Sequence, residues 1–127
     1  MKLIFNFNSE DADFENSKFK VVFLEDAFVF LKGLPVKHAQ KILQGIRKSQ
    51  LGNDSVFFKK IDSDIWEFRT LYQGLQYRLL AFWDKRDKNN TLVIVTHGFI
   101  KKQSKVPDLQ IKRAITIRLL YFKNLTQ

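Results

Sequence analysis

Apolar residues in the first half of the chain recur at helical spacing, after two short runs that are typical of strands. The runs at residues 1–7 and 19–24 are rich in β-branched and aromatic residues and predict strands, with a polar, acidic loop between them. Residues 25–34 predict a short helix, because acidic residues stand in its first turn and a glycine stands near its end. Pro35 then opens a second helix, which ends at residues 51–53. One face of this helix is apolar: Val36, Ala39, Leu43 and Ile46.

The second half of the chain changes to a period of two. Residues 65–72 and 77–84 alternate as half-buried strands do, with a turn at Gln73 and Gly74 between them. Residues 91–96 are apolar on both faces, which predicts a central strand. A last helix is predicted from Pro107 to Phe122.

These elements follow one another as strand, two helices, three antiparallel strands and helix. Helices grouped before a run of strands are typical of α+β domains. We therefore predict an α+β fold in which two N-terminal helices pack on one face of a small twisted antiparallel sheet, followed by a C-terminal helix. Its 127 residues are of single-domain length, so residues 1–127 are expected to form one domain.

The excess of positive charge indicates the kind of partner that the protein binds. The chain holds 22 Lys and Arg against 13 Asp and Glu, and its N-terminal extension, residues 1–17, is acidic. The remaining body is therefore strongly basic and attracts polyanions, among which nucleic acid is the commonest candidate. The alternative is a basic protein whose lysines only solvate its surface. The chain has no cysteine, no long apolar run and no secretory signal, so we expect a cytoplasmic protein without a membrane partner.

Several kinds of catalytic site are disfavoured by the residues present. The two histidines, His38 and His97, fall on different elements, so a zinc site is not expected, and His38 is predicted to be a solvated surface residue. Asp62, Asp64 and Glu67 could suggest a two-metal nuclease, but two turn residues and one exposed Glu explain them more simply. Phosphate-binding loops are missing as well. We expect no metal and no cofactor.

The remaining polar residues form a cationic group. Arg69 and Arg78 flank the predicted hairpin turn at similar distances, which places them near each other across the two strands. His97, Lys101 and Lys102 follow where the third strand ends. Such a cationic rim can cleave RNA without a metal, because the 2′-OH of RNA is a built-in nucleophile. Arg stabilises the phosphorane charge, and His or Lys transfers protons.

Four segments also resemble a known family. Residues 66–69 (WEFR), 77–80 (YRLL), 97–102 (HGFIKK) and 107–114 (PDLQIKRA) occur in the order found in the phage-derived HigB-like branch of the RelE/ParE toxin superfamily. The resemblance covers the chain from about residue 18 to residue 122.

The resemblance implies a RelE-like fold and a type II toxin that cleaves mRNA on the ribosome and leaves a 2′,3′-cyclic phosphate. It also implies a helix-turn-helix, HigA-like antitoxin as partner. Carried over by position, Arg69 and Arg78 would stabilise the phosphate, Lys101 or Lys102 would bind phosphate or assist proton transfer, and His97 would be an acid or base. Tyr121 falls near a C-terminal aromatic of some relatives. Further residues expected to contact RNA are Lys59, Lys60, Lys105, Arg113 and Arg118.

Two alternatives to the mRNA endoribonuclease remain open. A ParE-like relative would inhibit DNA gyrase without cutting RNA, and a non-catalytic module would only bind nucleic acid or an antitoxin. The extension through Ser17 departs from the family pattern and is expected to be a solvated tail. Gly98, where the third strand ends, is expected to serve the RNA site or to permit unusual backbone angles.

Overall fold

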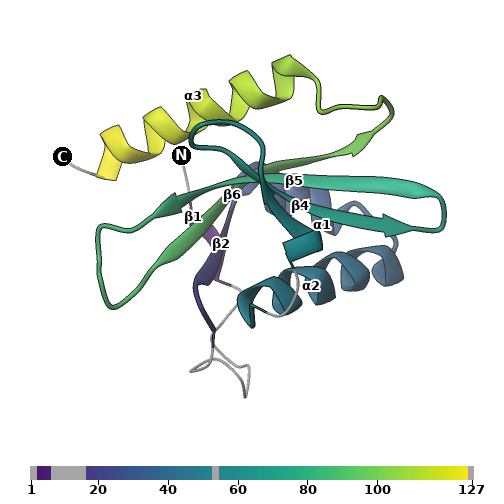
Figure 1. The fold of residues 1–127 in the computed structure, drawn as a ribbon, viewed down its shortest axis with the longest axis horizontal. Coiled ribbons are helices and arrows are strands. Elements are labelled where there is room, and N and C mark those ends of the chain that lie inside the picture. Colours follow the sequence, from purple (N-terminus) through teal and green to yellow (C-terminus); the bar gives the residue numbers. More distant parts are fainter. Residues whose placement is uncertain (1–2, 7–16, 53–54, 126–127) are drawn as a thin grey trace.

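The structure is a computed structural model that describes residues 3–6, 17–52 and 55–125. Figure 1 shows the fold, whose elements are, in chain order, β1 (Leu3–Asn6), β2 (Lys20–Leu24), α1 (Glu25–Lys32), α2 (Val36–Gln50), the short 3₁₀ helix η2 (Ser55–Phe57), β3 (Phe58–Lys60), β4 (Trp66–Tyr72), β5 (Leu75–Asp84), β6 (Leu92–Lys101) and α3 (Asp108–Leu125). The predicted acidic loop between the first two strands falls at residues 7–16, outside the described residues. Residues 3–6 form β1, which pairs with β2, so the expectation that the N-terminal extension is a solvated tail was wrong for this part.

Within the described residues, the six strands form one mixed sheet in the order β1-β2-β6-β5-β4-β3. Strand β2 runs parallel to β6, and the other neighbouring strands are antiparallel. The prediction of an antiparallel sheet was therefore wrong. The central strand β6 needs a partner on each side, and β2 fills the second side although about 70 residues separate the two in the chain. Parallel pairing requires such a long crossover, which α1, α2 and β3–β5 provide here.

Helices cover both faces of the sheet, so the prediction of helices on one face was also wrong. Figure 1 shows α3 on one side of the sheet and α2 on the other. One apolar cluster joins α1 and α2 to alternate residues of β5, such as Leu79 and Ala81. A second cluster joins α3 to the residues between them, such as Leu80 and Phe82. Because β5 is apolar on both faces, each face must be covered.

The local predictions agree with the structure within a few residues, except at the end of the third predicted strand. Strand β6 continues to Lys101, five residues beyond the predicted end at Thr96, so His97 and Lys101 lie within the strand and not after it. Helix α1 begins at Glu25, and α2 follows Pro35, which is its N-cap residue. The turn at Gln73 and Gly74 is present, and both residues have positive φ angles, of 50° and 78°. A two-residue turn of this kind matches the twist of a β-hairpin. Strand β3 was not predicted, because it is only three residues long.

His38 is not the solvated residue that was expected. Its ring nitrogens hydrogen-bond the Tyr77 hydroxyl (Nδ1 to Oη, 2.7 Å) and the Gln73 side chain (Nε2 to Oε1, 3.1 Å). Its ring also packs edge-on against Tyr72. His38 therefore ties α2 to the hairpin turn, a contact between distant segments that spacing along the chain does not reveal.

Across the part of the chain that the structure describes, none of the helices is long and apolar enough to span a membrane.

Candidate nucleic-acid interface

Arg69 and Arg78 lie directly opposite each other on β4 and β5, which confirms their predicted proximity. The two-residue hairpin turn sets this register. Both side chains contact Glu67, which lies two residues before Arg69 on the same face of β4. Arg69 Nε donates a hydrogen bond to Glu67 Oε1 (2.6 Å), and Arg78 Nε lies 3.6 Å from Glu67 Oε2.

Glu67 is only 1% exposed, which corrects the prediction of an exposed Glu. Burying a carboxylate is costly unless it is paired, and the two arginines supply that pairing. Burial lowers the pKa of Arg78, Glu67 opposes this shift, and the neighbouring charge of Arg69 adds to it. Glu67 thus holds two like charges side by side on one face of the sheet. In the described residues, no group of three or more His, Asp or Glu side chains is arranged to hold a metal ion.

A groove of about 340 Å³ lies between Arg69 and Glu67 on one side and the segment that leads into α3 on the other, whereas Arg78 is buried and does not line it. Its lining combines three cations with two carboxylates and short apolar side chains: Ile61, Glu67, Arg69, Lys101, Ser104, Lys105, Val106, Asp108 and Ile111. Lys59 stands opposite Glu67 on β3 and so shares this face of the sheet. Lys102 is exposed in the segment after β6, outside the groove lining.

A β-bulge in β6 places Lys101 in the groove. The register between β5 and β6 shifts by one residue, so that Leu80 pairs with His97 while Ala81 pairs with Val95. The extra residue, Thr96, reverses which face the following side chains point toward. Lys101 therefore faces the same side as Arg69, where strict alternation from Val95 would have turned it toward α1.

His97 is buried and does not line the groove. It is 1% exposed, and its two ring nitrogens lie 2.9 Å from Thr96 Oγ1 and 2.8 Å from Gln110 Oε1. Burial lowers the pKa of His97 to about 4, against a smaller opposing effect of the hydrogen bond with Gln110. The ring is therefore neutral at pH 7, and it joins β6 to α3 rather than facing solvent.

Tyr121 lies at the other end of the sheet from the arginine pair. Its hydroxyl donates a hydrogen bond to Asp84 Oδ2 (2.8 Å), at the end of β5, and the residue is 2% exposed. Burial and this hydrogen bond raise the pKa of Tyr121. A hydrogen bond from Arg86 is the main reason that the pKa of Asp84 is lowered. The structure therefore does not bring Tyr121 together with Arg69 and Arg78.

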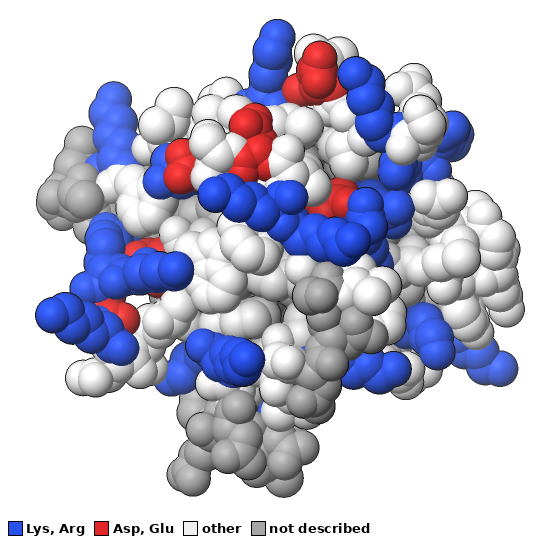
Figure 2. Space-filling view, viewed as in Figure 1, with Lys and Arg blue, Asp and Glu red and all other residues white. Residues whose placement is uncertain are grey.

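The other residues predicted to contact RNA do not form one surface. Lys105 lines the groove and Lys59 lies beside it, whereas Lys60 and Arg118 line a second pocket. Arg113, on α3, forms an ion pair with Asp26 of α1 (2.7 Å). Figure 2 shows the same spread, with Lys and Arg side chains in several groups over the face that it presents.

Comparison with known protein families gives a match to a family of phage-derived proteins. The model of the family described as phage derived protein Gp49-like (DUF891) matches residues 29–121. The chain belongs to this family. The phage-derived Gp49-like family is associated with toxin–antitoxin modules. The chain matches no curated protein and no solved structure.

The match to the Gp49-like family begins within α1 and ends within α3, so it contains Arg69, Glu67, Arg78 and Lys101. Sequence reasoning had found three of these residues and had misread Glu67 as exposed. The only local signal was Arg69, which lies two residues later on the same face and indicates an ion pair with Glu67 rather than its burial. The positions of Lys59 and Arg78 beside Glu67 follow from the sheet register. The finer assignment of this Gp49-like protein to a HigB-like branch stays a prediction.

Proposed function

We propose that this Gp49-like protein is the toxin of a type II toxin–antitoxin system and a metal-independent endoribonuclease that cleaves mRNA on the ribosome. The observation that carries the proposal is the pair of opposed arginines, Arg69 and Arg78, held by buried Glu67 beside a basic groove. The association of the family with toxin–antitoxin modules supports the toxin assignment.

The proposed reaction uses the RNA itself as nucleophile. The 2′ oxygen attacks the adjacent phosphorus, the bond from phosphorus to the 5′ oxygen breaks, and a 2′,3′-cyclic phosphate forms. The 2′-OH loses its proton to a base, and the departing 5′ oxygen gains one. Arg69, which lines the groove, neutralises the charge that develops on the phosphorane. Arg78 is only 6% exposed and adds positive potential beside it from a fixed position, so this stabilisation needs no reorganisation during the reaction.

Lys101 and Lys105 line the groove and would hold the flanking phosphates. For proton transfer we favour Lys101 over His97, because both ring nitrogens of His97 already have partners inside the protein. Lys102, which is exposed beside the groove, is a further phosphate contact in this proposal. Glu67 is a positioning residue, since it contacts both arginines.

The proposal includes the partners and location that such a toxin requires. These are mRNA on the ribosome, a helix-turn-helix, HigA-like antitoxin and the cytoplasm. The basic character of the described surface is consistent with an RNA partner, since Lys and Arg supply most contacts to phosphate groups.

Expression from a tightly controlled promoter, with primer extension across a translated reporter mRNA, tests the proposal. We expect cuts within codons that disappear when the start codon of the reporter is removed. Lys101→Ala should abolish most cleavage with an unchanged melting temperature, and Tyr121→Phe should keep cleavage. Arg69→Ala should also abolish most cleavage but lower the melting temperature, because it removes the closest partner of buried Glu67. Lys37→Ala, on the exposed surface of α2, is the control.

Three results would contradict the proposal. Toxicity that survives the combined loss of Arg69, Arg78, Lys101 and Lys102 would show that the groove is not the active site. Growth arrest with intact mRNA would favour a gyrase inhibitor, which a supercoiling assay detects. Absence of both arrest and cuts in a host that supplies ribosomes and mRNA would favour a non-catalytic binding module.

A further inference from the structure

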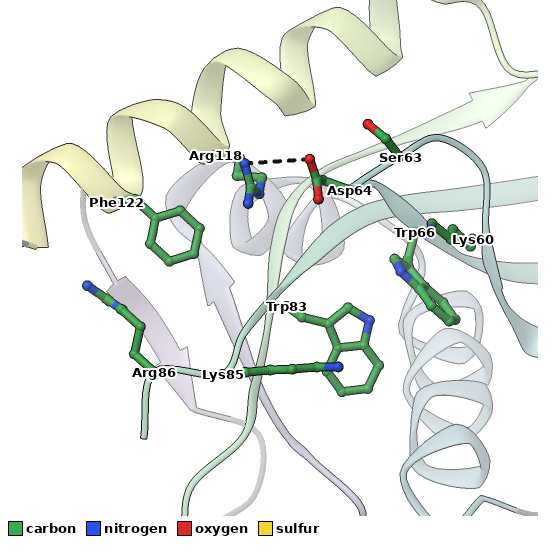
Figure 3. A pocket seen from close by; sticks show the side chains of 9 residues that line it. All are labelled: Lys60, Ser63, Asp64, Trp66, Trp83, Lys85, Arg86, Arg118 and Phe122. Carbon is green, nitrogen blue, oxygen red and sulfur yellow. Dashed lines mark ion pairs between the residues drawn. The ribbon is translucent and has the colours of Figure 1, made fainter. Parts of the chain in front are cut away.

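A second pocket lies where β4 begins and β5 ends, beside the C-terminal half of α3 (Figure 3). Its volume is about 480 Å³, within the range of pockets that hold small ligands. Its lining shares no residue with the groove and consists of Lys60, Ser63, Asp64, Trp66, Trp83, Lys85, Arg86, Arg118 and Phe122. Figure 3 shows aromatic rings from three elements around one space.

The aromatic residues offer ring faces and edges to a flat ligand. Trp66 and Trp83 meet edge to face, with ring centroids 5.7 Å apart and an angle of 79° between their planes. Phe122 reaches the pocket from α3, and all three side chains are partly exposed. Partly exposed tryptophans that are not fully covered by the core are typical of surfaces that stack nucleobases.

Four cations surround these rings, with one carboxylate among them. The ammonium of Lys85 lies 4.8 Å from the centre of the Trp83 ring, and the guanidinium of Arg118 lies 5.1 Å from that of Phe122. Arg86 is held by Asp84 (2.8 Å), whereas the ion pair between Arg118 and Asp64 is long, at 3.8 Å. A base that stacks on Trp83 would displace the Lys85 ammonium from the ring. The ammonium could then pair with a phosphate of the same strand.

We propose that this pocket binds one nucleotide of single-stranded RNA, with its base against Trp83 and Trp66 and its phosphates near Lys60, Lys85 and Arg118. Aromatic faces beside a cationic rim are the combination that binds single strands, whereas the bases of a duplex are already stacked on one another. The single-stranded nucleotide is inferred from the pocket itself, and the choice of RNA rests on the proposed function. The pocket would hold a segment of the strand away from the cleavage groove.

Tryptophan fluorescence reports on the pocket, because the chain has only two tryptophans and both line it. Both also line a neighbouring apolar pocket beside Phe19 and Phe58, so the lysine variants below assign the signal to one pocket. The probe is a single-stranded 2′-deoxyoligonucleotide of about ten nucleotides, a length that spans one such site. It lacks the 2′-OH, so the protein cannot cleave it by the proposed reaction. We expect saturable quenching of the full chain, and we expect Arg69→Ala to retain it.

Two double variants, each of which removes two positive charges, distinguish binding in the pocket from nonspecific electrostatic attraction of the oligonucleotide. Lys60→Ala with Lys85→Ala should weaken binding about tenfold or more, because two phosphate contacts are lost. Lys37→Ala with Lys41→Ala removes two exposed lysines of α2 and should change affinity less than about twofold. Melting temperatures should be unchanged in both, since all four lysines lie on the surface or on a pocket rim.

Absence of saturable quenching, or equal weakening by the two double variants, would overturn the proposal. Equal affinity for uridine monophosphate would overturn the assignment to a strand, because the pocket would then take free nucleotides. Quenching without cuts in mRNA would support the pocket proposal and contradict the endoribonuclease proposal. Cuts in mRNA without quenching would overturn the pocket proposal and leave the endoribonuclease proposal standing.

Discussion

At the scale of single residues, three buried polar side chains in this Gp49-like protein have side-chain partners. Glu67 lies between Arg69 and Arg78, His97 lies between Thr96 and Gln110, and Asp84 accepts hydrogen bonds from Arg86 and Tyr121. A buried polar group without a partner would cost several kcal/mol, so these pairs are stabilising only as units. Two of them give predictions.

The stability of the protein is expected to fall as the pH is lowered from about 6.5 toward 4. The pKa of His97 is about 4 in the folded protein and near its ordinary value of 6.5 in the unfolded chain. In this window the unfolded state binds the proton more readily, so stability rises with pH. The loss amounts to about 3 kcal/mol at the acid end. Chemical denaturation at a series of pH values measures it.

His97→Gln is the matched variant for this prediction, because glutamine does not titrate and can still hydrogen-bond. It should flatten the pH dependence between pH 4 and 6.5. Asp84, whose pKa is lowered, loses its own contribution below about pH 4 and so acts in a more acidic window. An unchanged slope in His97→Gln would show that His97 is not the responsible group.

Glu67→Gln is expected to destabilise the protein by about 3 kcal/mol, the lower end of the cost of removing one partner from a buried ion pair. The lower end applies because Arg69 remains 36% exposed and partly solvated, while Arg78 is left buried without its carboxylate. Urea denaturation measures the change. Asp62→Asn, at an exposed position, is the control and should change stability by less than about 0.5 kcal/mol.

A second variant separates electrostatics from packing. Adding Arg78→Met to Glu67→Gln removes the unpaired cation and should recover part of the lost stability. If the double variant is less stable than Glu67→Gln by itself, the arginine contributes through its packing, and the proposed electrostatic role of Glu67 is incorrect.

At the scale of elements, the close approach of α1 to β6 depends on Gly98. A Cβ atom at this position would lie 2.4 Å from Phe30 Cδ2 and 2.5 Å from Leu79 Cδ2. The positive φ angles of glycine in the described residues are those of Gly52 and Gly74, so the expectation of unusual backbone angles at Gly98 was wrong. Packing of α1 on the sheet is the reason for a glycine here.

Gly98→Ala is therefore expected to destabilise the fold by about 1–3 kcal/mol through overpacking. Thermal denaturation followed by circular dichroism measures the change. Gly33→Ala is the control, because its Cβ would have no neighbour closer than 3.5 Å, and it should have little effect. Equal tolerance of the two substitutions would mean that Phe30 moves aside freely and that α1 is not fixed by this contact.

At the scale of the whole molecule, the excess of positive charge is spread over several groups of side chains (Figure 2). The formal net charge is +9, and both the groove and the second pocket hold more cations than carboxylates. Affinity for RNA that relies on such groups depends on the release of counterions from phosphates.

RNA affinity is accordingly expected to fall steeply with added salt. Three groove cations, Arg69, Lys101 and Lys105, predict a slope of log K against log salt of about −2 or steeper for a single strand. Lys101→Ala with Lys105→Ala should reduce that slope by about 1.4. Fluorescence anisotropy with a labelled oligonucleotide at several salt concentrations measures both. A flat response would exclude binding through the phosphate backbone.

The sequence by itself determined the local elements and one feature of the site. Helix and strand periods placed α1, α2 and the hairpin, and the two-residue turn set the register that makes Arg69 and Arg78 neighbours. These features depend on interactions between residues that are close in the chain, so a local pattern is sufficient to predict them.

Only the tertiary structure decided what covers each face of the sheet. A period of two tells which side chains share a face, but it does not tell which distant segment packs on that face. The parallel pairing of β2 with β6 and the packing of α3 opposite α1 and α2 both join segments far apart in the chain. That packing encloses His97 and Glu67 and leaves Lys101 in the groove, because burial depends on the whole fold rather than on the neighbours of a residue in the sequence.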